Sequence, residues 1–170
     1  MDRGDDLRIG PVADTEAYRL LKSEVLGSQF PWYWREPHKQ AGFPLHCHTL
    51  IERPEAGLRV PKMSSPFAEL AHDVVLETCE ANGVLVNSIL RMAVNATERR
   101  SGYKTTSETH VDHEFDHRNL LIYLTDADGA TVVGERRHEP EVDTAIFFTG
   151  SHYHELPTTG RRIVLVTTYI

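Results

Sequence analysis

The sequence predicts a mostly β domain, a β-sandwich of jelly-roll type with N-terminal helices packed on the outside of one sheet. Helical spacing of apolar residues is confined to the region before Gly83, and short β-rich runs separated by turn residues continue from there to the C-terminus. Helices followed by evenly spaced strands are typical of a two-layer β-fold covered on one side. We therefore expect one domain spanning 1–170, with 1–83 mainly helical support and 84–170 the β-roll core.

Two helices are expected in the N-terminal part. Asp14 or Thr15 can cap the first, whose apolar residues recur at helical spacing and stop at Gly27. Ser65 can cap the second, with a proline at the first helical position, and the pair Asn82-Gly83 ends it. The polar first ten residues are expected to fray.

The remaining chain is expected to be extended. The turn Asp126-Ala-Asp-Gly129 lies between two apolar runs and predicts a tight hairpin. Together with the other turn residues, it divides the chain into seven expected strands: 84–96, 107–113, 118–125, 130–136, 143–149, 152–156 and 161–169.

Composition and charge exclude several classes of partner. The formal net charge of −7 and the absence of a Lys/Arg run argue against a nucleic-acid backbone as the main partner. The N-terminus has acidic residues where a signal peptide is basic, and no apolar run is long enough to span a bilayer. Cys47 and Cys79 form no CxxC motif, so free buried thiols are expected. We expect a cytoplasmic protein with no membrane partner and leave its oligomeric state open.

The most informative pattern is a set of histidines with one carboxylate. His110 and Asp112 stand at i and i+2, so both side chains reach one ion if this segment is a strand. His152 and His154 lie on a later strand that can be adjacent in the roll, and both stay candidates for a third ligand. Two imidazoles and one carboxylate leave open positions on a redox-active iron, unlike the closed sites of structural zinc.

The same segment carries a family resemblance. The C-terminal half resembles, in unbroken order, the prolyl-hydroxylase-like branch of the Fe(II)- and 2-oxoglutarate-dependent oxygenases. The resemblance rests on His110-Val-Asp112, Leu121-Ile-Tyr-Leu124, Asp128-Gly129, Pro140, Ile146-Phe-Phe148, His154-Glu155 and Gly160-Arg-Arg-Ile-Val-Leu165.

This resemblance implies that the jelly roll is a double-stranded β-helix. It also implies a cosubstrate, a metal and the residues that hold them. The metal, Fe(II), falls to His110, Asp112 and His154, the last preferred to His152 because its interval from the Phe-Phe pair is the better match. Arg162 directly precedes the hydrophobic final strand and is assigned the far carboxylate of 2-oxoglutarate.

Further residues are expected near this site. Arg161 is the less favoured neighbour of the cosubstrate arginine, and Tyr123 takes the position of a tyrosine that binds the same carboxylate in related enzymes. A second group is expected to face the substrate or to support the ligands: Arg91, Asn95, His152 and His113.

The expected reaction consumes O2 and 2-oxoglutarate, releases succinate and CO2, and hydroxylates an aliphatic C–H bond. The halogenating branch of the family lacks the carboxylate ligand, so the presence of Asp112 favours hydroxylation. Expected substrates are a small molecule, an amino acid or a prolyl-type peptide.

Two alternatives compete with this interpretation. His113-Glu-Phe-Asp-His117 matches the HExxH motif of zinc peptidases, but that motif requires a helix with a buried face. A cupin-like protein that binds a metal or small ligand without oxygenase activity would share the roll.

Two other motifs are expected to be structural. His46-Cys-His48 has no partner pair at zinc spacing and is expected to be a strand or loop feature. The aromatic cluster Phe30, Trp32, Tyr33 and Trp34 is expected to pack between the first helix and the roll, with a wall of the substrate site as the alternative.

Overall fold

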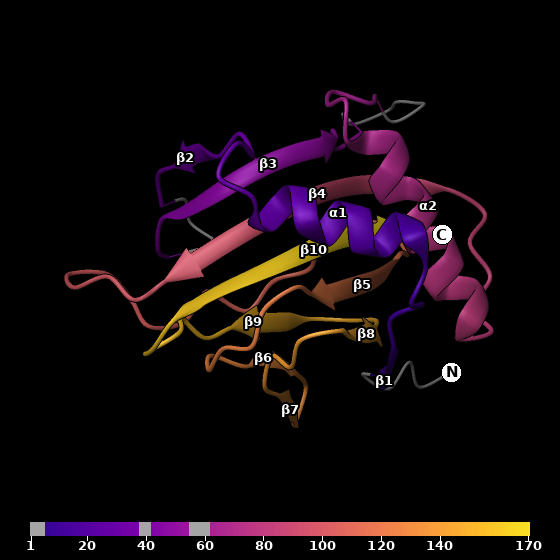
Figure 1. The fold of residues 1–170 in the computed structure, drawn as a ribbon. Coiled ribbons are helices and arrows are strands. Elements are labelled where there is room, and N and C mark those ends of the chain that lie inside the picture. The colour runs from indigo at the N-terminus through magenta and orange to yellow at the C-terminus, as the bar shows by residue number, and fades with distance from the viewer. Residues whose placement is uncertain (1–5, 38–41, 55–61) are drawn as a thin grey trace.

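Two antiparallel β-sheets form the body of the protein in the computed structural model, which describes residues 6–37, 42–54 and 62–170 (Figure 1). Within these residues the major sheet has seven strands in the order β1-β8-β5-β10-β4-β3-β2, and the minor sheet has three in the order β7-β6-β9. The major sheet contains β1 (Leu7–Pro11), β2 (Tyr33–Arg35), β3 (Leu45–Ile51), β4 (Ile89–Glu98), β5 (Arg118–Tyr123), β8 (Thr144–Phe148) and β10 (Arg161–Tyr169). The minor sheet contains β6 (Thr131–Val133), β7 (Arg136–His138) and β9 (His152–His154).

Both expected helices are present and lie across one face of the major sheet (Figure 1). The helix α1 (Glu16–Leu26) begins where the Thr15 hydroxyl accepts a hydrogen bond from the backbone N–H of Tyr18, at 3.2 Å. The helix α2 (Ala68–Ala81) begins three residues after Ser65, whose hydroxyl accepts a hydrogen bond from the N–H of Phe67. The predicted arrangement, a mostly β roll with helices outside one sheet, is confirmed.

Side-chain alternation gives the major sheet two different faces. On β4, β5 and β10, one set of alternate residues is apolar and packs against the helices in the main core. The opposite set faces the minor sheet and begins a second, smaller apolar cluster that includes Leu121, Tyr123 and Val164. Polar residues on this second face therefore point between the two sheets.

The N-terminal part contributes more to the sheet than the sequence predicted. The first ten residues were expected to fray, but Leu7–Pro11 forms β1 and pairs with β8 at the edge of the sheet. The support region 1–83 was expected to be mainly helical, and β1, β2 and β3 all come from it. These strands are completed by partners far along the chain, which local spacing does not reveal.

Two predicted local structures are wrong. The turn at Asp126–Gly129 does not close a hairpin, because β5 pairs with β8 and β10 while β6 pairs with β7 and β9. The turn instead carries the chain from one sheet to the other. The segment 107–113 is not a regular strand, although His110 forms an isolated antiparallel bridge with His152.

The crossing turn is fixed by Asp128 and Gly129. One carboxylate oxygen of Asp128 accepts hydrogen bonds from the backbone N–H groups of Thr158 and Thr159, each at 3.0 Å. These bonds and the Thr158 hydroxyl lower the pKa of Asp128 to about 2. Gly129 has a φ of 89°, and a Cβ there would lie 2.7 Å from the backbone nitrogen of Pro157.

We therefore expect Gly129→Ala to destabilise the protein more than Gly160→Ala. Both glycines have positive φ, but a Cβ at Gly160 meets no atom within 4 Å. Gly160→Ala should lower the free energy of unfolding by about 1–2 kcal/mol from backbone strain alone, and Gly129→Ala by more because backbone atoms must move. Urea unfolding of the two variants measures the difference, and equal losses would contradict the close contact.

Candidate metal centre

A cavity of about 110 Å³ lies between the second face of the major sheet and the minor sheet. It is lined on the major sheet by residues of β4, β5 and β10, and on the minor sheet by residues of β6 and β9. The lining residues that carry the chemistry are Arg91, Asn95, Thr97, His110, Asp112, Tyr123, Thr131, His152, His154 and Arg162, with Arg53 at the side.

Three histidines meet in this cavity. Ring nitrogens of His110, His152 and His154 lie within 4.8 Å of one another. Two backbone hydrogen bonds of 2.9 Å join His110 to His152, and their ring centroids are 4.5 Å apart. The ring centroids of His110 and His154 are 6.0 Å apart.

Asp112 lies beside this group, with its two carboxylate oxygens facing different partners. Oδ2 is 3.6 Å from Nε2 of His152. Oδ1 accepts hydrogen bonds from Arg53 and Arg91, each at 2.9 Å, and Arg53 also donates to the backbone carbonyl of Asp112. The sequence did not predict Arg53, which follows β3 and meets Asp112 only through the fold.

The charge states suit metal binding. Burial alone would raise the pKa of Asp112, but the positive charges of Arg91 and Arg53 and the neighbouring His152 lower it. Burial lowers the pKa of His152 to about 4, so its ring is neutral near pH 7. A neutral imidazole and an ionised carboxylate are the forms that bind a divalent metal.

Arg162 is a buried cation with incomplete hydrogen bonding. Its side chain is almost inaccessible, and Nη1 donates to the backbone carbonyls of Gly129, at 2.6 Å, and Glu155, at 3.0 Å. Nε is buried without a hydrogen-bond partner, and no carboxylate lies within 4 Å of the guanidinium in the described part of the chain. A guanidinium that lines a cavity in this state is suited to bind an anion, because an unpaired buried charge costs several kcal/mol.

Tyr123 is connected to the histidines through Thr131. The Thr131 hydroxyl lies 2.9 Å from the Tyr123 hydroxyl and 3.0 Å from Nδ1 of His154. Burial raises the pKa of Tyr123 to about 12, so its hydroxyl stays protonated. The chain of three side chains orients the His154 ring through its Nδ1 atom.

The residues predicted to surround the site divide into two groups. Arg91, Asn95 and His152 line the cavity, and the side-chain oxygen of Asn95 is buried without a hydrogen-bond partner in the described structure. His113 does not line it. Its Nε2 lies 2.8 Å from the Thr168 hydroxyl, and its ring stacks on Phe115.

The competing motifs resolve as structural features. Residues 113–117 form no helix, so the two histidines of the HExxH motif lack the geometry that a zinc peptidase requires.

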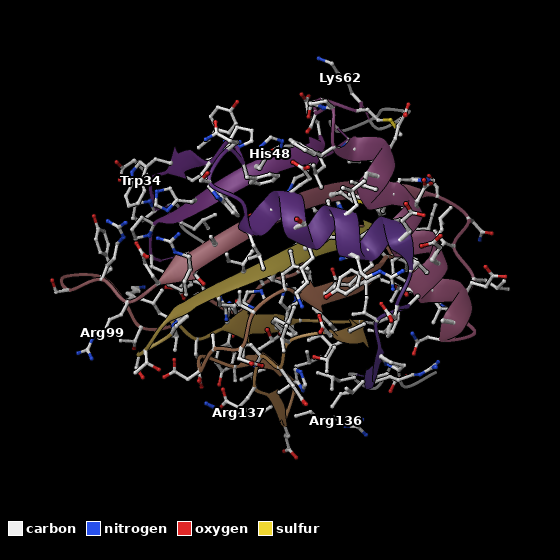
Figure 2. All side chains as sticks on the ribbon, viewed as in Figure 1. Trp34, His48, Lys62, Arg99, Arg136 and Arg137 are labelled. Atoms are coloured by element: carbon white, nitrogen blue, oxygen red, sulfur yellow. The ribbon has the colours of Figure 1, made fainter. Side chains whose placement is uncertain are left out.

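His48 lies on β3 and is buried (Figure 2). Its two ring nitrogens contact the Pro31 carbonyl at 2.6 Å and the Ser65 hydroxyl at 2.7 Å. The predicted strand or loop role of His46-Cys-His48 is confirmed.

The aromatic cluster is divided between the core and the surface. Phe30 packs in the main core against Trp32 and Phe67, which confirms the packing role for its buried part. Tyr33 and Trp34 on β2 are exposed, with Trp34 at one end of the molecule (Figure 2).

Comparison with known proteins gives similarity in structure alone. No protein-family model and no curated protein matches the chain. A 2OG-Fe(II) oxygenase family oxidoreductase from Burkholderia pseudomallei has a TM-score of 0.70 at 15% identity, covering 96% of this chain and 84% of that one. A prolyl-4-hydroxylase from Pseudomonas putida has a TM-score of 0.60 at 10% identity, covering 98% and 92%. The α-ketoglutarate-dependent carbocyclase SnoK from nogalamycin biosynthesis has a TM-score of 0.63 at 14% identity, covering 98% and 80%.

These similarities define the class of fold. The chain has the fold of the 2-oxoglutarate- and Fe(II)-dependent oxygenases, with prolyl hydroxylases among its structural neighbours. The resemblance inferred from the C-terminal half of the sequence is confirmed at this level. No helix in the described ranges is long and apolar enough to cross a bilayer.

We expect Thr131→Val to destabilise the protein more than Tyr123→Phe. Tyr123→Phe removes one hydroxyl and leaves Thr131 bonded to His154, which should cost about 1 kcal/mol of unfolding free energy. Thr131→Val leaves both the Tyr123 hydroxyl and His154 Nδ1 without their partner, so the cost should be about 2 kcal/mol or more. Chemical denaturation measures both, and a smaller loss for Thr131→Val would contradict the bridging role.

Proposed function

We propose that this protein is an Fe(II)- and 2-oxoglutarate-dependent dioxygenase that hydroxylates an aliphatic C–H bond. The observation that carries the proposal is the pairing, in one cavity, of a metal-ligand set with a buried guanidinium that has no carboxylate partner among the described residues. 2-Oxoglutarate has one end that chelates a metal and a carboxylate at the other end. Arg162 is suited to bind that second carboxylate, with Tyr123 in the same cavity.

The donor set fits Fe(II). Imidazole and carboxylate ligands suit iron, and two histidines with one carboxylate leave positions open for a cosubstrate and O2. His110 and Asp112 supply two of the proposed ligands. The resemblance assigns the third to His154, but the 3.6 Å approach to Asp112 and the backbone bridge to His110 favour His152. We propose His152 as the third ligand, with His154 directed toward the cosubstrate.

When bound, iron and 2-oxoglutarate supply the oxidising power that activates the C–H bond, with succinate and CO2 as products. The protein's own residues bind and orient. Arg91 and Arg53 hold Oδ1 of Asp112 so that Oδ2 faces the metal position. Apolar side chains of the second core cluster, including Leu121 and Val164, line the cavity and exclude water from it.

The proposed substrate is a small molecule, an amino acid or a prolyl-type peptide. The structural neighbours include a prolyl-4-hydroxylase and a carbocyclase, so this fold supports more than one oxidative outcome. Hydroxylation is the outcome that we propose here. The free, buried thiols of Cys47 and Cys79 support action in a reducing compartment, and we propose the cytoplasm.

One observation favours a second candidate, a cupin-like protein that binds a metal without oxygenase activity. The three imidazoles converge without Asp112, whose Oδ1 is bonded to two arginines. Such a protein would bind the metal through histidines alone. Its metal affinity would be unchanged in Asp112→Asn, and it would release no succinate.

The first test is an anaerobic titration with Fe(II) and 2-oxoglutarate, followed by the visible charge-transfer band. We expect the band in the wild type and its loss in His110→Ala and Asp112→Ala, because each removes a proposed ligand. His72→Ala, on α2 and away from the cavity, serves as the control. The band in either ligand variant would refute that residue's assignment.

The third ligand is tested by comparing His152→Ala with His154→Ala. We expect His152→Ala to abolish Fe(II) binding and His154→Ala to retain it with weaker 2-oxoglutarate binding. Equilibrium dialysis of Fe(II) and the charge-transfer titration measure the two effects separately. The reverse order would return the third position to His154.

The cosubstrate arginine is tested by Arg162→Ala against Arg161→Ala. Arg161 is exposed and pairs with Glu98, at 2.9 Å, so its removal should leave the affinity for 2-oxoglutarate unchanged. Arg162→Ala should weaken that affinity about a hundredfold, since charge-assisted hydrogen bonds are lost, and leave Fe(II) binding intact. An unchanged affinity would remove Arg162 from the site.

A further inference from the structure

A second, larger cavity adjoins the metal cavity. It measures about 690 Å³ and shares four lining residues with the first: Leu45, Arg53, Arg91 and Asn95. Its remaining walls come from β2, β3 and the residues that follow each strand, including Arg35, Glu36 and Glu52. A group bound in this outer cavity would therefore lie beside the proposed metal ligands.

Three arginines line the outer cavity. Arg53 and Arg91 both pair with Oδ1 of Asp112, so two guanidinium groups share one carboxylate oxygen. Arg35, on β2, lies 3.4 Å from the Thr49 hydroxyl. The outer cavity therefore brings three cationic side chains together around one carboxylate oxygen and one hydroxyl.

The acidic residues of the same cavity are directed elsewhere. Glu36 accepts a hydrogen bond from the indole N–H of Trp34 at 2.8 Å, and Glu52 lies 4.0 Å from Lys62. Within the described residues, neither glutamate comes within 4.0 Å of a cavity arginine. Asp112 is the carboxylate that contacts Arg53 and Arg91, and it is also a proposed metal ligand.

A hydrogen-bond acceptor stands where the two cavities meet. The side-chain oxygen of Asn95 is buried and has no partner in the described structure. Thr97, two residues along β4 and on the same face, also has a buried hydroxyl without a partner and lines the inner cavity. A ligand with an N–H or O–H group at this position would satisfy the Asn95 oxygen.

We propose that the outer cavity binds the carboxylate of the substrate, with Arg53 and Arg35 as its ligands, and that an N–H of the substrate donates to Asn95. Arg91 is the inner cation that joins this anion site to Asp112. The substrate class is then a carboxylic acid with an adjacent N–H, such as an amino acid or an N-acyl amino acid. This inference deepens the proposed function and rests on it for the identity of the inner cavity.

The test uses the full-length protein loaded with Mn(II) and 2-oxoglutarate, which fills the inner anion site without turnover. The probes are matched pairs of an acid and its primary amide: N-acetyl-alanine, N-acetyl-valine and N-acetyl-leucine. Broadening of the probe's proton NMR lines by Mn(II) reports binding beside the metal. We expect at least one acid to bind about tenfold or more tightly than its amide, as charge-assisted bonds require.

Substitutions of Arg35 and Arg53 test whether these arginines cause the tighter binding of acids than of amides. Arg35→Gln and Arg53→Gln should each reduce the acid-to-amide ratio at least threefold. Arg99→Gln is the matched control, because Arg99 is exposed, projects outward at one end of the molecule (Figure 2) and lines neither cavity. Arg35 has no contact with Asp112, so Arg35→Gln should leave Mn(II) and 2-oxoglutarate binding unchanged.

The outcomes separate the two proposals. Equal binding of acids and amides, no acid binding at about 10 mM, or a ratio unchanged in both arginine variants would overturn the anion site. The probe titration is repeated on metal-free protein by saturation-transfer NMR. An acid preference there, lost in Arg35→Gln, would support the outer site even if Mn(II) and 2-oxoglutarate fail to bind, a result that would refute the oxygenase proposal alone.

Discussion

Because successive side chains of β4, β5 and β10 point to opposite sides of the major sheet, these central strands serve two purposes at once. Their apolar faces pack under α1 and α2, with Met92, Ile122 and Leu165 almost completely buried. Their other faces carry Arg91, Asn95, Thr97, Tyr123 and Arg162 into the space between the sheets. The candidate site is therefore built largely on paired strands, whose backbone positions are fixed by hydrogen bonds on both sides.

The positively charged side chains of the site are divided between the two cavities. Arg162 lines only the inner cavity and Arg35 only the outer one, while Arg53 and Arg91 line both and contact Asp112. Two anionic ligands can then be bound at separate cations, one in each cavity. In surroundings of low dielectric constant these attractions are stronger than in water, and an ion of the wrong charge is excluded by the same fields.

Most of the fold could be predicted from local sequence patterns. Thr15 and Ser65 mark helix starts, and apolar runs such as Ile163–Val166 mark buried strands. Pairing between distant segments could not be predicted in this way. The turn at Asp128-Gly129 has the composition of a hairpin, but the partners of β5 and β6 lie in different sheets, and only tertiary packing decides between these outcomes.

The candidate site shows the same division. Side-chain chemistry and order along the chain indicated His110, Asp112 and Arg162, which the fold brings to one cavity. The choice between His152 and His154 depends on distances to Asp112, which sequence intervals do not encode. Arg53 follows β3 with no motif around it, so its ion pair with Asp112 could be found only from the structure.

The edges of both sheets carry features that disfavour pairing with another chain. At the ends of the major sheet, β1 contains Arg8 and ends at Pro11, and β2 is three residues long and ends at Arg35. On the minor sheet, the edge strand β7 carries Arg136 and Arg137, which project from that side of the molecule (Figure 2). Short strands, prolines and like charges oppose the intermolecular β-pairing that leads to aggregation. An open sandwich of this kind thus protects its strand edges by local sequence and not by closure of the sheet.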